Sequence, residues 1–499
     1  MKSLKKAKYL LKAAVIIVIL MAFVMPGTAI TPNTSFMNTS HGVKPLARAE
    51  WIEQASGFPT PSRGIDFISV VDENIAWAEG YDGQIPFGPC QDYTKTIDGG
   101  ATWTANTIAG ADGLRFTMLS AIDVNTCWAC MFAAAGTGPQ GIWYTADGGS
   151  TWVQQTTAAF DPSSSVSFPD CVHFFNANVG WCMGDPRDGY FEIYTTNNSG
   201  TNWERVPSAN IPAPLSGEFG VMGYSTSLGD TIWYGTNLGR VYKSIDRGHH
   251  WTVAQTTNPA YIKPAFRDAD HGLVIDLNLA AAAILSETSD GGATWTDVPF
   301  TGPCYDSDLC YVPGTTNMYI SVGGASGMSG ASYSLDGGHS WTDYSEFQGG
   351  PNPIQLLAVA FTANKIGWAG SFNVDETTGG VWKHVQTEVP KPQFTIDITG
   401  GKGLIVNVKN VGDGNATNVN CIIGITGGLW IKQRDFTETE SLIATGGNFS
   451  FTEKVMGIGL GLLKSKPVPS ITITVTCSEN VSATRTVNAK IFLSKVTLQ

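Results

Sequence analysis

Charged side chains are scarce in this sequence of 499 residues. Asp, Glu, Lys and Arg together make up 14% of it, whereas about a quarter is usual in soluble proteins. Hydrophobic residues reach 42%, which is ample for the cores of two or more domains. Gly, Ser, Thr and Asn fill the places of the missing charges, and this composition is typical of an extracellular β protein.

Long apolar runs are also scarce, and the one that exists lies near the N-terminus. It spans residues 13–25, which is short of the roughly 20 residues that a membrane-spanning helix needs. Five lysines precede it and Pro-Gly-Thr-Ala at 26–29 follows it, as in a secretory signal. We predict a signal peptide over 1–29, a flexible segment over 30–50, and a secreted or cell-surface location. The alternative, an uncleaved signal anchor, is the only membrane contact that we expect.

Basic residues are few in the middle of the chain. Residues 30–390 hold 14 Lys and Arg against 35 Asp and Glu, while residues 391–499 hold 11 against 7. An acidic surface repels phosphate backbones, so we expect no nucleic-acid partner. The histidines show no H-E-x-x-H motif, and Cys127 and Cys130 form a C-x-x-C without the second pair that a zinc site requires. We therefore expect no metal and no cofactor.

Nine cysteines in an exported chain are most simply disulfide formers, with one left over. Three pairs are predicted from their positions: Cys421 with Cys477, Cys171 with Cys182 across a hairpin-like turn, and Cys304 with Cys310 across a short loop. Six N-x-S/T sequons are candidate glycosylation sites, at Asn33, Asn38, Asn197, Asn415, Asn448 and Asn480.

An eight-residue phrase recurs six times and is the strongest pattern in the chain. Its first copy is TIDGGATW at 96–103, and its closing tryptophans, with a weaker seventh at Trp382, are 41 to 51 residues apart. Each repeat begins with an alternating strand, a turn and a second strand. A third strand then leads into the phrase, and a short fourth strand follows it. Four strands per repeat at this period predict the blades of a β-propeller.

The ends of the repeat array predict how the ring closes. The strand-turn-strand phrase occurs seven times, but the seventh repeat has no fourth strand, whereas residues 51–54, Trp-Ile-Glu-Gln, resemble the fourth strands elsewhere. We predict that this segment pairs with the last blade. The expected fold is therefore all-β, with a seven-bladed propeller over residues 51–388.

The pattern changes at Val-Pro-Lys-Pro, residues 389–392. Prolines on both sides of a lysine favour an extended linker, which we place at 389–393. About seven short alternating strands then fill residues 394–499, and this number predicts an immunoglobulin-like β-sandwich. The phrase VKNVGDGNATNVNC at 408–421 resembles adhesion-type sandwich modules of prokaryotic surface proteins.

The recurring phrase S/T-x-D-x-G-x-T/S-W is similar to the Asp box, or bacterial neuraminidase (BNR) repeat. An aspartate at its third position can accept bonds from backbone N–H groups of its own turn, glycine permits positive φ, and the tryptophan packs on a neighbouring sheet. We therefore interpret these residues as turn clips and not as a catalytic or metal array. The box positions are Asp98, Asp147, Asn198, Asp246, Asp290, Asp336, Trp103, Trp152, Trp203, Trp251, Trp295 and Trp341.

The phrases GWAxG, YKS and DGGxTW at these spacings resemble the photosystem II stability/assembly-factor-like repeat proteins over residues 51–385. The resemblance implies a ring that binds partner proteins without catalysis. We expect a binding or scaffolding protein whose partner is an extracellular protein or carbohydrate. We place the ligand on the face of the ring where loops between blades converge. A purely structural envelope component is a further alternative.

Sialidases and xyloglucan-cleaving glycosidases carry the same box on related rings, so a secreted glycoside hydrolase with an accessory sandwich is the enzymatic alternative. A sialidase needs an arginine cluster and a Tyr/Glu nucleophile pair, and this ring is poor in arginine. A two-carboxylate glycosidase needs a pair about 5 to 10 Å apart. The carboxylates that could reach the faces of the ring are Asp66, Asp185, Asp188, Glu218 and Asp276, and an aromatic platform could draw on Tyr81, Phe87, Trp143, Tyr190, Phe191 and Tyr224.

Overall fold

The computed structural model describes residues 51–85, 87–277, 283–325, 328–344, 347–348, 354–385, 391–412, 414–460, 468–479 and 481–499. Within these ranges the regular structure is β, apart from two short 3-10 helices, η1 (Ser208–Asn210) and η2 (Ala363–Lys365). The chain divides between residues 386 and 387 into two compact units, called here the N-terminal and C-terminal units. The predicted signal peptide and the segment 30–50 lie outside the described residues.

Five sheets of the described N-terminal unit each contain four consecutive antiparallel strands. Their strands are β6 (Leu114–Ala121), β7 (Cys127–Ala133), β8 (Gly141–Thr145), β9 (Val153–Gln155); β10 (Pro169–Phe174), β11 (Gly180–Arg187), β12 (Tyr190–Thr196), β13 (Glu204–Arg205); β14 (Gly220–Leu228), β15 (Thr231–Thr236), β16 (Arg240–Ser244), β17 (Thr252–Gln255); β18 (Ile262–Phe266), β19 (Gly272–Asp276), β20 (Leu285–Thr288), β21 (Thr296–Asp297); and β22 (Asp308–Tyr311), β23 (Tyr319–Ala325), β24 (Met328–Ser334), β25 (Thr342–Asp343).

A nine-stranded sheet joins the two ends of this unit. It contains β2 (Arg63–Val70), β3 (Ala76–Asp82), β4 (Asp92–Thr96), β5 (Thr104–Thr107), β27 (Ala358–Phe361), β28 (Gly367–Asp375), β29 (Thr378–His384), β1 (Trp51–Ala55) and β26 (Phe347–Gln348). Strands β2–β5 form one group of four, and β27–β29 with β1 form another. The two groups meet where Gly64 pairs with Phe372.

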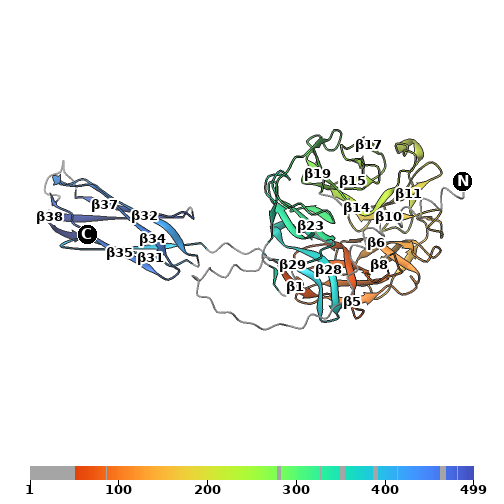
Figure 1. The fold of residues 1–499 in the computed structure, drawn as a ribbon, viewed down its shortest axis with the longest axis horizontal. Coiled ribbons are helices and arrows are strands. Elements are labelled where there is room, and N and C mark those ends of the chain that lie inside the picture. The colour runs from red at the N-terminus through yellow and green to blue at the C-terminus, as the bar shows by residue number, and fades with distance from the viewer. Residues whose placement is uncertain are drawn as a thin grey trace. The chain divides into compact units, whose positions relative to one another are not determined.

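Strand β1 completes the last group, because it pairs antiparallel with β29 from Trp51 opposite His384 to Ala55 opposite Gly380. This confirms the prediction that residues 51–54 pair with the last repeat. The first strands of successive groups also touch in a closed circuit, which runs β2, β6, β10, β14, β18, β22, β27 and back to β2. Figure 1 shows the groups arranged around a common centre, with the red start of the unit beside its blue-green end.

Because neighbouring strands are antiparallel, the turns between them lie alternately at the two ends of each sheet. The turn between the third and fourth strands lies at the same end as the turn between the first and second, and we call this the box end. The turn between the second and third strands lies at the opposite end, together with the segment that leads to the next sheet. We call this the far end.

Large aromatic side chains fill the spaces between neighbouring sheets. Trp128 and Trp233, both on second strands, are fully buried. The ring of Trp233 stacks on Phe266 of the next sheet at 3.8 Å between centroids, and its Nε1 donates to the carbonyl oxygen of Gly291 at 3.0 Å. The corresponding bond of Trp128 goes to Ser199. Each sheet therefore completes the core of its neighbour, as a repeat architecture requires.

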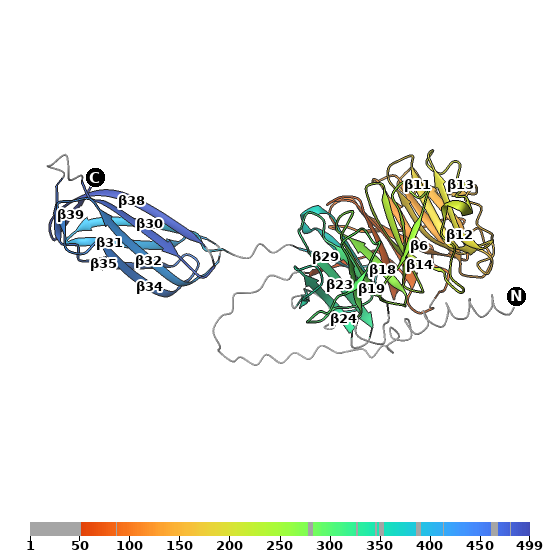
Figure 2. The same cartoon turned by 90° about the horizontal axis from the view of Figure 1, so that it is seen from above.

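The C-terminal unit contains two antiparallel sheets. The smaller holds β30 (Phe394–Gly401), β31 (Gly403–Asn410) and β35 (Asn448–Glu453); the larger holds β32 (Ala416–Thr426), β33 (Trp430–Ile431), β34 (Asp435–Ile443), β36 (Gly457–Gly459), β37 (Ser470–Thr476), β38 (Ser482–Leu493) and β39 (Lys495–Leu498). Burial alternates along β30 and β37, and one core takes residues from both sheets. Figure 2 shows the long strands running alongside one another.

The prediction of a Cys171–Cys182 disulfide is wrong. All nine cysteines are free thiols in the structure. Cys171 lies opposite Met183, and Cys182 lies opposite Val172. Because side chains alternate along a strand, the two sulfur atoms leave opposite faces of the sheet.

The other two predicted disulfides are also absent. Cys421 lies opposite Val475, and Cys477 comes two residues later, past the end of β37. Cys304 packs in one hydrophobic cluster, whereas Cys310 on β22 packs against another. Being the only two cysteines of the C-terminal segment, or being close in sequence, is therefore not enough to bring two sulfur atoms together.

The sequons fall into three groups. Asn197 and Asn448 are exposed, and Asn415 is half-buried. The other three, Asn33, Asn38 and Asn480, lie outside the described residues.

Candidate functional site

The carboxylate of each Asp box binds its own turn. In the first box, the Thr96 hydroxyl donates to Asp98 Oδ1 at 2.9 Å and accepts the N–H of Gly100 at 2.7 Å. Asp98 also accepts the N–H of Thr102 at 2.9 Å and its hydroxyl at 2.6 Å. The same bonds recur in residues 145–151, 288–294 and 334–340. These hydrogen bonds lower the pKa of Asp98 to about 2.

Two boxes depart from this pattern and keep the turn. Asn198 accepts the Thr196 hydroxyl at 3.0 Å and the Asn202 N–H at 2.9 Å through its amide oxygen. In the fourth box the His250 ring nitrogen takes the place of the hydroxyl, 2.6 Å from Asp246 Oδ2. A neutral acceptor therefore suffices for the turn.

Each box turn is also tied to the first hairpin turn of its own sheet. The residue after the box Asp or Asn has positive φ in all six copies, and its N–H donates to a carbonyl oxygen of that hairpin. The donor–acceptor pairs are Gly99–Asn74, Gly148–Asn125, Ser199–Asn178, Arg247–Asp230, Gly291–Asp270 and Gly337–Asn317. The polar groups of the box thus hold the two turns of the box end together.

The box tryptophans add links, some of them between sheets. Trp103 and Trp203 donate to Gln54 Oε1 at 3.1 Å and Gln155 Oε1 at 2.9 Å, both on fourth strands of the preceding groups. Trp152 Nε1 lies 3.5 Å from the Tyr93 hydroxyl. The remaining three donate to glycine carbonyl oxygens of their own boxes: Trp251, Trp295 and Trp341.

The far end of the sheets has a different chemistry, because arginines gather there, each beside a carboxylate. Along four consecutive groups, the pairs and their shortest distances are Arg63–Asp92 at 2.8 Å, Arg115–Asp66 at 2.8 Å, Arg187–Glu192 at 2.9 Å and Arg240–Glu218 at 3.0 Å. Glu192 and Glu218 are buried. Desolvation of a buried ion pair is costly unless its hydrogen bonds are satisfied. The hydrogen-bond partners around each pair therefore determine whether it stabilises the fold.

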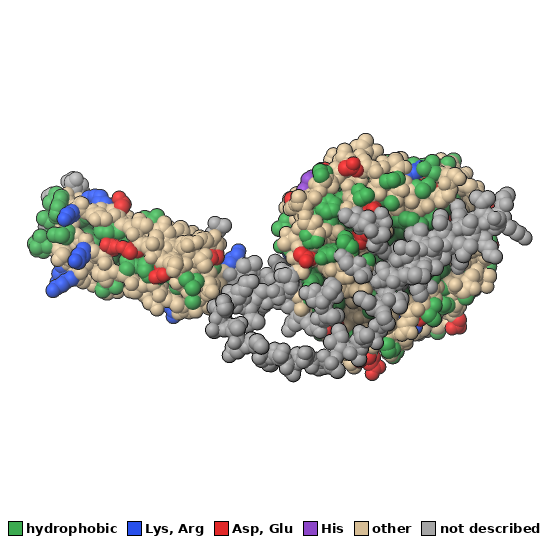
Figure 3. All heavy atoms as spheres, in the orientation of Figure 1, with side chains coloured by type: hydrophobic (Ala, Val, Ile, Leu, Met, Phe, Trp, Pro, Cys, Tyr) green, Lys and Arg blue, Asp and Glu red, His purple; other side chains and the backbone are tan. Residues whose placement is uncertain are grey.

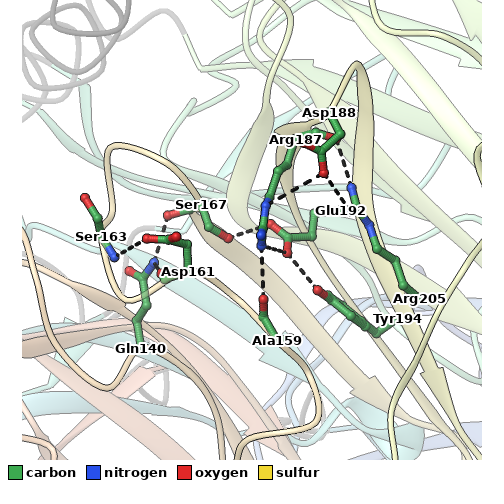
Figure 4. Close-up of polar contacts among 10 residues, drawn as sticks. All are labelled: Gln140, Ala159, Asp161, Ser163, Ser167, Arg187, Asp188, Glu192, Tyr194 and Arg205. Carbon is green, nitrogen blue, oxygen red and sulfur yellow. Dashed lines mark hydrogen bonds and ion pairs between the residues drawn. The ribbon is translucent and has the colours of Figure 1, made fainter. Parts of the chain in front are cut away.

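Figure 4 shows the residues around the Arg187–Glu192 pair. Buried side-chain atoms without a hydrogen-bond partner occur in the other three pairs, at Arg63, Arg115 and Glu218, but not in this one. Glu192 accepts the Ser167 hydroxyl at 2.5 Å, the Tyr194 hydroxyl at 2.7 Å and Arg187 Nη1 at 2.9 Å. Arg187 Nη1 also donates to the Ala159 carbonyl oxygen at 3.0 Å. Ser167 and Ala159 belong to the segment that joins β9 to β10, so these bonds fix that segment against the β11–β12 hairpin.

A second arginine stands beside Arg187 at the tip of this hairpin. Arg205 Nη1 donates to Asp188 Oδ2 at 2.9 Å, Arg187 Nε lies 3.9 Å from the same oxygen, and Arg205 Nη2 donates to the Arg187 carbonyl oxygen. The Arg205 guanidinium lies over the Tyr190 ring at 4.2 Å. Asp188 has a positive φ of 61° and its side chain is 64% exposed. We call Arg187, Asp188, Tyr190, Glu192 and Arg205 the Arg187 cluster.

The carboxylates that sequence analysis considered for a glycosidase are all engaged. Asp66 and Glu218 pair with arginines, and Asp188 pairs with Arg205. Asp185 accepts the N–H of Gly220, and Asp276, which is buried, accepts the N–H of Ile284. Among the described residues, no group of three or more His, Cys, Asp or Glu could hold a metal ion.

The aromatic residues singled out in the sequence do not form one platform. Phe191, Trp143 and Tyr81 are buried in the core. Tyr81 and Phe87 lie against Arg115, at 5.2 and 5.1 Å from its guanidinium carbon. Tyr190 covers Arg205, and Tyr224 lies near Lys263. Several of these rings thus accompany cations at the far end.

Two members of the Arg187 cluster, Asp188 and Tyr190, are among the candidates predicted from the sequence, but the cluster with Arg187, Glu192 and Arg205 is not. A signal for it was present in PRDGYFEIY at 186–194. Glu192 stands between Phe191 and Ile193, which are both fully buried. A carboxylate within such a strand needs a cationic or hydrogen-bonded partner, and Arg187 on the other side of a Asp-Gly turn is within reach in a hairpin.

The fold and the recurring box make the N-terminal unit a β-propeller of the BNR-repeat class. The family model described as "Photosynthesis system II assembly factor YCF48" matches residues 136–260, which include the Arg187 cluster. No protein of curated function matches the sequence significantly. No helix in the described ranges has the length and apolarity needed to cross a membrane.

Similar solved structures include assembly factors and glycosidases. The structure titled "YCF48 bound to D1 peptide" has 19% identity and a TM-score of 0.49, over 68% of this chain and 99% of that one. YCF48 from Cyanidioschyzon merolae has 18% identity and a TM-score of 0.45, over 67% and 99%. The GH74 enzyme from Niastella koreensis has 12% identity and a TM-score of 0.44, over 89% and 76%. At these identities, the similarity concerns the fold.

Proposed function

We propose that this protein is a secreted or cell-surface, non-catalytic propeller that binds a partner protein at its far end. The groups of four strands are then seven blades, which the closed circuit of first strands and the pairing of β1 with β29 support. The C-terminal unit is then an immunoglobulin-like sandwich, which its two antiparallel sheets and shared core support.

The observation that carries the binding proposal is the convergence of Arg187 and Arg205 on one exposed carboxylate, that of Asp188. Planar guanidinium groups recognise carboxylates through paired, charge-assisted hydrogen bonds. Glu192 holds one guanidinium in place, and the Tyr190 ring holds the other. Because both are held before a ligand arrives, less side-chain entropy is lost on binding.

The ligand that fits this cluster is an acidic segment of an extracellular protein. One of its carboxylates would replace Asp188 between the two arginines. Since the recognition is of charge, it favours a protein over a neutral glycan. The match of the assembly-factor family model to residues 136–260 supports a role in binding.

The same residues argue against the enzymatic alternative. Tyr194 and Glu192 lie 2.7 Å apart beside Arg187, the residue types that a sialidase uses. Both are buried, however, and burial together with the charge of Glu192 raises the pKa of Tyr194 well above its ordinary value. The phenol therefore stays protonated and donates to Glu192 instead of attacking a substrate.

A peptide-library selection tests the proposal. Residues 30–499 would be used to select from a random peptide library, and the enriched sequences should contain Asp, Glu or a free C-terminal carboxylate. The R187Q/R205Q variant should bind them at least tenfold more weakly, since charge-assisted bonds are worth about 1.5–3 kcal/mol each. Arg247→Gln is the matched control, because Arg247 pairs with Asp230 at the box end.

Two results would contradict the proposal. One is a failure of the selection test, in which either the enriched peptides lack acidic groups or the control variant loses as much binding as R187Q/R205Q. The other is hydrolysis of a glycoside that a single carboxylate substitution abolishes.

A further inference from the structure

The C-terminal unit carries an exposed apolar stripe across one end of its larger sheet. Trp430 on β33 lies opposite Ile458 on β36, Ile458 lies opposite Phe492 on β38, and Phe492 lies opposite Lys495 on β39. Their neighbours Ile431 and Ile491 are buried, so the stripe residues point to the outer face. Trp430 is 50% and Phe492 is 54% exposed.

Three more apolar side chains extend this stripe at the same end. Leu429 precedes β33, Met456 precedes β36, and Leu493 is the last residue of β38, where the chain turns into β39, with a positive φ of 52°. They are 54%, 42% and 57% exposed. Turns normally carry polar residues or glycine, so apolar side chains at these positions point to a contact outside the unit.

Lysines surround the apolar residues. The segments that form this end, 400–404, 429–432, 453–459 and 489–498, contain one acidic residue, Glu453. They contain five exposed lysines: Lys402, Lys432, Lys454, Lys490 and Lys495. Figure 3 shows hydrophobic and basic side chains gathered at the end of the unit that holds the C-terminus. We call these lysines and the six apolar residues the lysine-rimmed tip.

We propose that the lysine-rimmed tip binds the surface of an anionic lipid bilayer. Aromatic rings favour the depth of the lipid headgroups, and exposed aliphatic side chains can enter the acyl boundary below them. Lysine stems can lie along apolar surface while their ammonium groups reach the lipid phosphates. The proposal does not depend on the function proposed for the Arg187 cluster.

The positive charge of the lysine-rimmed tip favours an anionic bilayer as its binding partner. Residues 391–499 carry 11 basic and 7 acidic residues, whereas residues 30–390 carry 14 and 35. The chain thus places its basic apolar surface on one unit and its acidity on the other. This arrangement holds the sandwich at an anionic membrane while the membrane repels the propeller.

Vesicle sedimentation tests this inference. The protein would start at residue 30, so that the apolar segment at 13–25 cannot bind lipid. It should bind phosphatidylcholine vesicles that contain phosphatidylglycerol more tightly than pure phosphatidylcholine vesicles, and added salt should weaken the binding. The K490Q/K495Q variant should lose about 25-fold in partitioning to the anionic vesicles, about fivefold per lysine.

Apolar and control variants complete the test. W430S/F492S should lower binding to anionic vesicles at least tenfold, and both residues are exposed enough for the fold to tolerate the change. Lys409→Gln and Ile422→Ser are matched controls, exposed on β31 and β32 away from the tip, and should change binding less than twofold. Equal binding to neutral and anionic vesicles would overturn the proposal. So would a lack of vesicle binding together with self-association that W430S/F492S abolishes, because the tip would then bind a second copy.

Discussion

Removal of the Trp51 side chain should open the propeller at its seam. Trp51 is fully buried on the closing strand β1, and its ring meets those of His384, Tyr344 and Phe361 at 5.1, 5.8 and 6.1 Å between centroids. A buried Trp hides about 150–250 Å², and Trp→Ala in a core costs about 3–5 kcal/mol. At about 2 °C per kcal/mol for a large domain, the Tm of the propeller should fall by about 6–10 °C.

Hydrogen exchange would locate the damage. The amides of residues 51–55 and 380–384 should lose about a hundredfold or more of their protection in Trp51→Ala, since local opening follows the lost free energy. Ile52→Ala is the control on the same strand, because Ile52 is only half-buried and should cost about 1 kcal/mol. If Trp51→Ala left both segments protected to within tenfold of the unchanged protein, β1 would not be the strand that closes the ring.

Four further outcomes follow from the structure. Glu192→Gln should lower the Tm by several degrees, since removing one partner of a buried ion pair costs about 3–5 kcal/mol, whereas exposed Glu204→Gln should not; equal melting of the two would contradict the buried pair. Asp188→Asn should strengthen binding of acidic peptides up to about fivefold by removing a competing ion pair, and weaker binding in a titration would count against the Arg187 cluster. The pKa of Asp98 and Asp147 is lowered to about 2, so their contribution to folding stability is present above the unfolded pKa near 4 and is lost as pH falls from about 4 to 2. D98N/D147N should flatten the Tm–pH curve between these two pH values. An unchanged curve would refute this role of the two carboxylates. Thiol titration of the denatured, unreduced protein should count all nine cysteines, and a lower count would restore the disulfide prediction.

The repeated features were predictable because the same residue types recur at equivalent positions in six or seven repeats. The box turn, the order of four strands and the pairing of residues 51–54 all follow from comparing one repeat with the next. Register was not predictable in the same way. Whether Cys182 faces Cys171 or Val172 depends on a one-residue shift, and such a shift reverses the side of every residue in a strand.

The lysine-rimmed tip was hidden for a related reason. Trp430, Ile458 and Phe492 are far apart in the sequence, and only the order of strands in the larger sheet places them in one row. The excess of basic residues in the C-terminal segment was visible beforehand. That these basic residues lie together at one end of the unit could be seen only from the order of the strands in the sheet.

In each repeat, the residue four positions before the box Thr or Ser varies, whereas the box residues themselves are nearly constant. The box residues must clip every blade, so they are nearly the same in each copy and cannot single out one ligand. The position four residues earlier carries Asp92, Gly141, Glu192 and Arg240 in successive groups, and it lies at the far end of the third strand. Since three of these four residues form ion pairs there, the specificity of the ring is expected where its repeat is broken.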